Sequence, residues 1–253
     1  MPNLLLSGAS GQLCSAISRR IHAPFSILCG VDPVPPEGCA YPVYPSFSLV
    51  PTAPEVIVDA SHHTAIRPLL EYATAHHTPV VLCTTGHTAA ELSFIQQAAR
   101  EIPVLQSQNM ALGIHLIASL VRQAAAILGD GYDIEIVEAH HRRKTDAPSG
   151  SAYLLAAAAS AAFPQGKTIV CDRHDRQMPR AANEIGISSI RGGTMVGEHT
   201  VLFAGQDEVI TITHRADNRD LFATGALRAA AFLIGKPNGF YTMDDVCHIE
   251  STT

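Results

Sequence analysis

A short apolar run, a glycine loop and a one-sided helix follow one another at the start of the chain, and this succession restricts the fold more than any other feature. Residues 4–6 predict a strand, Gly8 and Gly11 stand in the loop, and residues 12–21 have apolar side chains at helical spacing. Backbone amides in such a loop can approach a pyrophosphate, whose charge the helix N-terminus stabilises. The pattern therefore predicts a dinucleotide-binding unit. Because Cys14 stands where a third glycine or alanine is usual, an ordinary tight turn is the alternative.

Asp32 supports the dinucleotide interpretation by its position. It ends the second predicted strand, 26–31, at 21 residues (32 minus 11) after Gly11. A carboxylate at that place can accept hydrogen bonds from ribose hydroxyls and would repel a 2′-phosphate. No Arg or Lys follows it in the segment 33–36, so the sequence favours NADH over NADPH. The alternative is an Asp that starts a turn before Pro33.

The first hundred residues alternate between strand and helix patterns, which predicts a parallel sheet with crossover helices. The expected strands are 4–6, 26–31, 56–59, 80–84 and 104–106, and the expected helices are 12–21, 64–75 and 89–102. Two loops after these strands, 83–86 and 107–110, carry hydroxyl and amide groups at the edge where such sheets bind ligands. Plain polar connections are the alternative.

The alternation changes after a long apolar helix at 111–128. Strands are expected at 132–139, 186–190, 199–204 and 208–214, with a hairpin turn at 205–207 and an Ala-rich helix at 150–163. A mixed-sheet α+β unit is therefore expected here. A helical stripe at 219–234 then follows and can pack back on the first half.

Composition excludes several classes of protein. With 47% hydrophobic and 16% charged residues the chain can bury a substantial core, and a net charge of −6 with a pI near 6.1 argues against nucleic-acid and anionic-membrane partners. Six cysteines without a C-x-x-C pair suit a reducing compartment, and the start of the chain has no signal-peptide pattern. No apolar run is expected to reach the roughly 20 residues of a membrane span. A cytoplasmic location is expected.

Polar and titratable residues are concentrated in one segment, 138–151, between a strand and a helix. His140 and His141 offer protons near neutral pH, Lys144 offers a cation, and the helix start at 149–151 offers amides and hydroxyls to a carboxylate. In an extended chain the two histidines point to opposite faces and should have different roles. A solvated surface loop with Ser149 as a simple helix cap is the alternative.

A metal site is the sharpest competing interpretation of the histidine content. The chain has 13 histidines, including the pairs 62–63, 76–77 and 140–141. None forms an H-E-x-x-H pattern, and no cysteine lies within a few residues of a pair, so no metal is expected.

The segment Glu138-Ala139-His140-His141-Arg142-Arg143-Lys144-Thr145-Asp146-Ala147-Pro148-Ser149-Gly150-Ser151 resembles the E-x-H-H-x-x-K-x-D-A-P-S-G-T signature of the dihydrodipicolinate reductases. Segments 191–193, 196–203 and 214–226 are similar to further motifs of that family, and with the glycine loop the similarity covers nearly the whole chain.

This resemblance implies a Rossmann-type dinucleotide-binding domain at 1–110 and 218–253, with an inserted substrate and tetramerisation domain at 111–217 that closes on it during turnover. It also implies reduction of 4-hydroxy-tetrahydrodipicolinate by NADH or NADPH in a homotetramer. His140 would be the proton donor and acceptor, and Lys144 a second donor. Substrate carboxylate would be bound by His141, Ser149, Gly150 and Ser151. Cofactor would be bound by Gly8, Ser10, Gly11, Gln12, Leu13, Asp32, Cys83, Thr84, Thr85, Ser107, Gln108, Asn109 and Met110.

The sequence departs from the family pattern at Gln12, Cys14, Ser107-Gln108 and Ser151, where Arg, Gly, Ala-Pro and Thr are usual. Two other functions stay open. A non-catalytic NAD-binding sensor would keep the fold and the altered glycine loop, and an enzyme such as an aspartate dehydrogenase would share the first half without needing segment 138–151.

Overall fold

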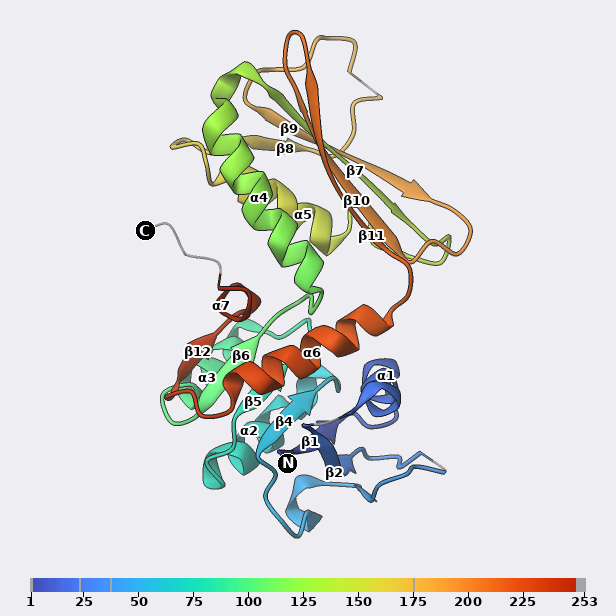
Figure 1. Ribbon diagram of the computed structural model, residues 1–253, viewed down its shortest axis with the longest axis vertical. Helices are drawn as coiled ribbons and strands as arrows, with labels where there is room; N and C mark the ends of the chain where they lie inside the picture. The colour runs from blue at the N-terminus through green and yellow to red at the C-terminus, as the bar shows by residue number, and fades with distance from the viewer. Residues whose placement is uncertain (1, 23, 37, 175, 249–253) are drawn as a thin grey trace. The chain divides into compact units, whose positions relative to one another are not determined.

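The chain divides into two compact units in a computed structural model that describes residues 2–22, 24–36, 38–174 and 176–248. One unit contains residues 1–111 and 220–253, and the other contains residues 112–219 (Figure 1). That the first unit binds the cofactor and the second unit binds the substrate stays a prediction.

The first unit is built on a seven-stranded parallel sheet in the order β12-β6-β5-β4-β1-β2-β3. The strands are β1 (Asn3–Ser7), β2 (Ser26–Val31), β3 (Val43–Tyr44), β4 (Val56–Asp59), β5 (Val80–Leu82), β6 (Pro103–Gln106) and β12 (Gly239–Tyr241). The strand order reverses between β1 and β4, which is the point where open α/β sheets bind ligands. The predicted Rossmann-type architecture is confirmed.

Helices cover both faces of this parallel sheet. They are α1 (Gln12–Arg20), α2 (Ile66–Ala75), α3 (Ala89–Ala98), α6 (Asp220–Leu233) and the short α7 (Met243–Val246), with 3-10 turns at Phe47–Leu49 and His63–Ala65. Helix α1 packs with α6, which lies along β4, β5 and β6, whereas α2 packs with α3 over a separate apolar cluster (Figure 1). The sequences of the central strands are nearly continuous runs of apolar residues, because both faces of these strands are buried.

Helix α6 comes very close to the loop after β6 at Gly225. A Cβ atom at this position would lie 1.7 Å from the carbonyl oxygen of Met110. Only glycine permits this approach without moving the backbone. The contact joins the last part of the unit to its first part.

The second unit has a mixed five-stranded sheet in the order β11-β10-β7-β9-β8, as expected. The strands are β7 (Asp133–His140), β8 (Thr168–Val170), β9 (Glu184–Arg191), β10 (Gly197–Ala204) and β11 (Val209–Ala216). Helices α4 (Leu112–Leu128) and α5 (Gly150–Ser160) pack together on one face (Figure 1). Within the described part of this unit, no helix covers the opposite face.

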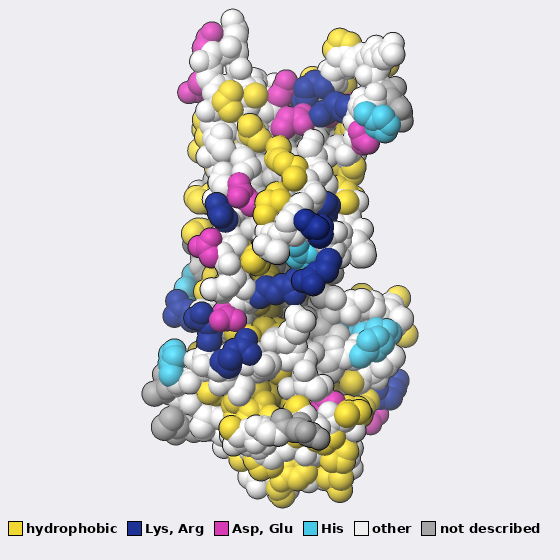
Figure 2. All heavy atoms as spheres, turned by 90° about the vertical axis from the view of Figure 1, so that its right-hand side faces the viewer, with side chains coloured by type: hydrophobic (Ala, Val, Ile, Leu, Met, Phe, Trp, Pro, Cys, Tyr) yellow, Lys and Arg dark blue, Asp and Glu magenta, His cyan; other side chains and the backbone are white. Residues whose placement is uncertain are grey.

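Ion pairs hold the segment between β8 and β9 against the sheet. Arg173 donates to both carboxylate oxygens of Glu135 at 2.8 Å, and Arg176 donates to Glu184 at 2.8 Å. Arg180 also bonds to Glu135. Figure 2 shows Lys and Arg side chains next to Asp and Glu side chains on the face that it draws. These partners explain why so many charges gather on one loop.

Several predicted boundaries need correction. Strands β3, β8 and β12 were not expected, and β5 ends at Leu82 instead of residue 84. Helix α3 ends at Ala98 and α5 at Ser160, each a few residues earlier than expected.

The expectation that no apolar run reaches membrane-spanning length is also wrong. The helix at Leu112–Gly131 passes that test by length and hydropathy, which is weak support for a span because core helices pass it too.

Candidate functional site

The glycine loop has the geometry that an anion-binding turn requires. Gly8 adopts a φ of +81°, and a Cβ there would lie 2.7 Å from the carbonyl oxygen of Ala60 in the loop after β4. Gly11 is the N-cap residue of α1, and it provides no side-chain hydrogen bond to the first turn, which begins at Gln12 and Leu13. The loop therefore fits the pyrophosphate of a dinucleotide at the helix N-terminus.

Ser10 and Asp32, both predicted to contact the cofactor, lie together. The Ser10 hydroxyl and amide donate to Asp32 Oδ2 at 2.5 and 3.0 Å, and the Val34 amide donates to Oδ1 at 3.0 Å. Burial raises the pKa of Asp32, but the hydrogen bonds from Ser10 and Val34 outweigh it and lower the pKa overall. An ionised carboxylate is thus fixed beside the glycine loop.

Cys14, the main departure from the usual glycine motif, is accommodated inside the unit. Its side chain is fully buried, and its thiol donates to the carbonyl oxygen of Ser7. Burial, and then the charges of Asp59 and Asp32, raise the pKa of the thiol to about 12. Cys14 is therefore a neutral packing residue beneath the loop.

Asp59 connects two loops at the same sheet edge and was missed by the sequence analysis. Its buried carboxylate accepts hydrogen bonds from the hydroxyls of Thr84 and Ser61, each at 2.6 Å. Thr84 is therefore a linking residue, whereas the neighbouring Thr85 is exposed. An Asp at the end of the buried strand 56–59 was the available signal.

The other predicted cofactor residues differ in how accessible they are. Cys83 is partly buried, and burial raises the pKa of its thiol. Ser107 is buried and donates to the carbonyl oxygen of Asn109 at 2.7 Å. Met110 is also buried, while Gln108 is exposed. The structure thus places these residues at one sheet edge without testing their contact with a nucleotide.

In the second unit, His140 ends β7 on the covered face of the sheet and bonds to Glu138. Its Nδ1 lies 2.6 Å from Glu138 Oε2. Arg191 donates to both oxygens of the same carboxylate, at 2.7 and 2.8 Å. Burial raises the pKa of Glu138, but hydrogen bonds from Arg191, Ser189 and His140 outweigh this and lower it to about 2. Glu138 is therefore an anion that accepts a hydrogen bond from Nδ1–H of His140. The other ring nitrogen, Nε2, then carries no proton in the neutral ring.

The imidazole of His140 is confined by its surroundings. The residue is only 9% exposed, and a Cβ at Gly197 would lie 3.0 Å from His140 Nε2. Burial lowers the pKa of His140, and the opposing effect of Glu138 is not enough to restore it because Lys144 and Arg191 also lower it. His140 is therefore neutral at pH 7.

His141 points away from this buried pair, as the strand alternation predicted. Its Nε2 lies 2.9 Å from Nη2 of Arg219, a residue that the sequence analysis missed. Both side chains line a pocket of about 320 Å³. The pocket residues are His141, Arg142, Arg143, Gly193, Thr194, Val196 and Arg219. Three arginines make this pocket suited to an anionic ligand.

The remaining predicted substrate residues lie in and after the same loop. Lys144 Nζ forms an ion pair with Asp146 at 2.8 Å. Ser149 is buried and caps α5, accepting a hydrogen bond from the Ala152 amide at 3.2 Å, as the helix-cap alternative proposed. Gly150 is exposed and has open space around it. The first turn of α5 is thus capped by Ser149 and accessible at Gly150.

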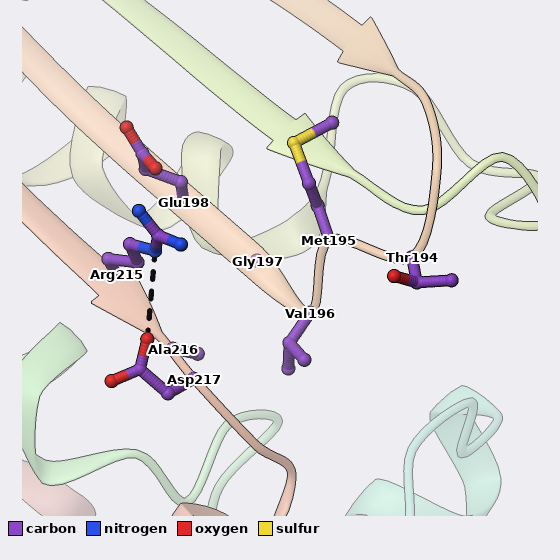
Figure 3. A pocket seen from close by; sticks show the side chains of 8 residues that line it. All are labelled: Thr194, Met195, Val196, Gly197, Glu198, Arg215, Ala216 and Asp217. Carbon is purple, nitrogen blue, oxygen red and sulfur yellow. Dashed lines mark ion pairs between the residues drawn. The ribbon is translucent and has the colours of Figure 1, made fainter.

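A second pocket shares Thr194 and Val196 with the first one and also has a volume of about 320 Å³. Figure 3 shows Arg215 and Asp217 on its strand side, joined by an ion pair of 3.6 Å. Both of these side chains are strongly exposed. Among the described residues, no group of three or more His, Cys, Asp or Glu side chains could hold a metal ion.

These features together define a class of protein. A Rossmann-type sheet with a glycine loop before its first helix binds a pyridine nucleotide, and the second unit supplies a His–carboxylate pair and a cationic pocket. This is the arrangement of a nucleotide-dependent oxidoreductase of a small molecule.

Comparisons with known proteins identify the family. Residues 3–110 match the family model "Dihydrodipicolinate reductase, N-terminus", and residues 113–247 match "Dihydrodipicolinate reductase, C-terminus". The chain therefore belongs to the dihydrodipicolinate reductase family, which confirms the resemblance of its motifs.

Relatives and solved structures agree with this assignment. The chain is 43% identical to the 4-hydroxy-tetrahydrodipicolinate reductase of Caldanaerobacter subterraneus subsp. tengcongensis, over 97% of this chain and 98% of the relative. It is 40% identical to the Clostridium novyi protein of the same name, with the same coverage. A dipicolinate-bound dihydrodipicolinate reductase from Paenisporosarcina sp. TG-14 shares the fold, with a TM-score of 0.79, 21% identity and coverage of 96% and 97%.

Proposed function

We propose that this chain reduces 4-hydroxy-tetrahydrodipicolinate to tetrahydrodipicolinate, with loss of water, by hydride transfer from NAD(P)H in diaminopimelate and lysine biosynthesis. Relatives that match nearly the whole chain are named for this substrate. The observation that carries the proposal is the His140–Glu138–Arg191 group beside the cationic His141–Arg219 pocket. A sensor would need the nucleotide loop but not this second group.

The protein groups of the second unit can manage the protons of such a reduction. NAD(P)H, when bound, supplies the hydride. Addition of hydride to a conjugated imine builds negative charge that a nearby acid must neutralise. Glu138 holds the Nδ1 proton of His140, so Nε2 is the atom that accepts and returns a proton. Lys144, whose charge is near enough to lower the pKa of His140, is the second donor, and it forms an ion pair with Asp146.

The substrate carboxylates would be bound by two groups of donors. Arg219 and His141 offer a cation and a ring nitrogen in one pocket. The start of α5 offers the amides of Gly150 and Ser151, which the buried cap Ser149 keeps in a helical turn. The Ser149 hydroxyl already accepts from Ala152, so we assign it to the cap.

The cofactor preference proposed here is NADH over NADPH. Asp32 is ionised and fixed by three hydrogen bonds at the end of β2. In the first unit, Arg19 and Arg20 both lie within ion-pair distance of Asp220, so we assign neither of them to a 2′-phosphate. The 2′-phosphate of NADPH would then lie beside the negative charge of Asp32, which disfavours its binding.

We also propose a homotetramer that assembles through the face of the mixed sheet opposite α4 and α5. This face carries small, β-branched and apolar side chains in cross-strand register, including the pairs Leu202–Thr211 and Ala204–Val209. Ile190 and Val209 are 50% and 58% exposed. Such a face is costly to leave in water. Light scattering after size exclusion should give four chains per particle. The expected cytoplasmic location and lack of nucleic-acid and membrane partners stay predictions.

The experiment that tests the function is an assay coupled to the synthase that forms the unstable cyclic substrate, with NADH and NADPH followed separately. We expect substrate-dependent oxidation of NADH in the wild-type protein. His140→Ala and Lys144→Ala should each lower kcat by about 100-fold or more with little change in nucleotide Kd. His174→Ala is the matched control, because the His174 side chain is exposed and its ion pair is with the neighbouring, also exposed Asp172. Nucleotide binding without turnover would favour the sensor instead.

A further inference from the structure

Three titratable residues form a row across the covered face of the mixed sheet. Glu138 on β7 pairs with His199 on β10, and His199 pairs with His214 on β11. Directly paired residues share a face of the sheet. His199 is only 4% exposed, and the mechanism proposed above assigns it no role.

His199 contacts the cap of the substrate-binding helix. Its Nε2 lies 2.9 Å from the hydroxyl of Ser149, which in turn accepts the amide of Ala152 in the first turn of α5. The Ser149 amide donates to Glu138 Oε1 at 3.2 Å. The start of α5 is therefore fixed from the sheet at two points, one on β7 and one on β10.

The other side of the His199 ring lacks a comparable contact. Its Nδ1 is buried and has no hydrogen-bond partner. The ring meets His140 edge-on, with centroids 5.1 Å apart and an interplanar angle of 74°. Burial, and then the neighbouring His140, lower the pKa of His199 to about 4, so a neutral ring packs against the neutral His140.

We propose that His199 is a positioning residue for the reductase reaction: through Nε2 it fixes the Ser149 cap at the start of α5. This inference rests on the proposed function. It assigns His199 no contact with substrate, and it makes Nε2 the atom on which the role depends. An ordinary buried histidine would contribute packing alone, without this dependence.

Two isosteric substitutions separate these alternatives. The amide nitrogen of Gln can occupy the place of Nε2, whereas that of Asn reaches only the place of Nδ1, which has no partner. We therefore expect His199→Asn to raise the KM for the cyclic substrate by about 10-fold, in line with the loss of a helix cap, with the KM for NADH unchanged. His199→Gln should stay within about threefold of wild type.

Ser149→Ala tests whether the effect passes through the cap. If His199 acts on substrate binding through Ser149, the double variant with His199→Asn should be little worse than Ser149→Ala alone. His214→Gln is the matched control. His214 lies next in the row but, among the described residues, does not hydrogen-bond to Ser149, so the variant should keep a substrate KM near wild type.

Binding of pyridine-2,6-dicarboxylate by calorimetry gives a readout without turnover, and thermal unfolding reports whether each variant is folded. A folded His199→Asn variant that binds this probe and turns over like wild type would overturn the inference. Equal losses for Asn and Gln, or fully additive effects with Ser149→Ala, would overturn it too. Failure of the wild-type protein to turn over would instead count against the proposed reaction, while the binding measurements would still test the role of His199.

Discussion

Nη2 of Arg219 lies 2.9 Å from Nε2 of His141, although 78 residues separate them in the chain. Because a guanidinium only donates, Nε2 of His141 must accept, and the imidazole proton is then on Nδ1. That nitrogen is buried and has no partner. The pocket that both residues line therefore presents the guanidinium cation of Arg219, which suits a carboxylate.

Replacement of Arg219 should weaken substrate binding selectively. Arg219→Met removes a charged donor from the pocket, and we expect the substrate KM to rise on the order of 10-fold to 100-fold. Arg219→Lys should recover part of this loss, because it keeps the charge but not the planar fork. Steady-state kinetics with saturating NADH provide the measurement. A similar rise in the Kd for NADH would contradict a role confined to the substrate.

Gly197→Ala should disturb the catalytic imidazole directly. The new methyl group would lie 3.0 Å from His140 Nε2, closer than ordinary van der Waals contact, so the ring must shift. We expect kcat to fall by about 10-fold or more, since small displacements of catalytic groups are costly. Gly131→Ala is the control, because a Cβ there meets nothing within 4 Å. Wild-type kcat in Gly197→Ala would show that Nε2 does not exchange the proton.

Glu138→Gln should remove a stabilisation that depends on pH in a defined direction. The pKa of Glu138 is lowered from 4.5 to about 2 in the folded protein, so its ionised form stabilises the fold above about pH 4.5. This stabilisation is lost as the pH falls from about 4.5 to 2. Urea unfolding should therefore show the variant less stable by about 3 kcal/mol at pH 7. The difference from wild type should shrink toward pH 2, and a difference that is constant over this range would contradict the ion-pair account.

Asp32→Asn should relax the preference for NADH. The substitution removes the charge that would oppose a 2′-phosphate, and we expect NADPH to bind about 10-fold more tightly relative to NADH. Fluorescence titration of both nucleotides gives the two Kd values. Ser10→Ala is the companion variant, since it removes one bond to Asp32 while keeping the charge. If NADPH already binds as tightly as NADH to the wild-type protein, the proposed preference is wrong.

The sequence predicted the longer elements because burial leaves a repeating pattern in them. Strands 26–31 and 56–59 were found with their predicted bounds, since each is an apolar run inside a parallel sheet. Strands β3 and β12 have only two or three residues and lack such a pattern. They exist through pairing: the Gly30 amide, for example, donates to the carbonyl oxygen of Pro42.

The same distinction applies to the site. Segment 138–151 was identified because its polar residues are contiguous, and the alternation of β7 correctly placed His140 and His141 on different sides. Arg191 and Arg219 received no role because their partners lie 53 and 78 residues away. The register of the strands and the path of the loops between them decide which residues neutralise Glu138 and which line the His141 pocket. A single sequence specifies neither.

The close approach of α6 to Met110 at Gly225 also has a consequence for how the molecule is made. The nucleotide-binding sheet is encoded in two pieces, and β12, which pairs with β6, is translated only after the whole second unit has been synthesised. Until then the edge of β6 is unpaired and the apolar surface that α6 covers is open to water. The inserted unit, in contrast, is contiguous and can fold as soon as it emerges, so the later half of the chain is expected to complete its fold before the earlier half.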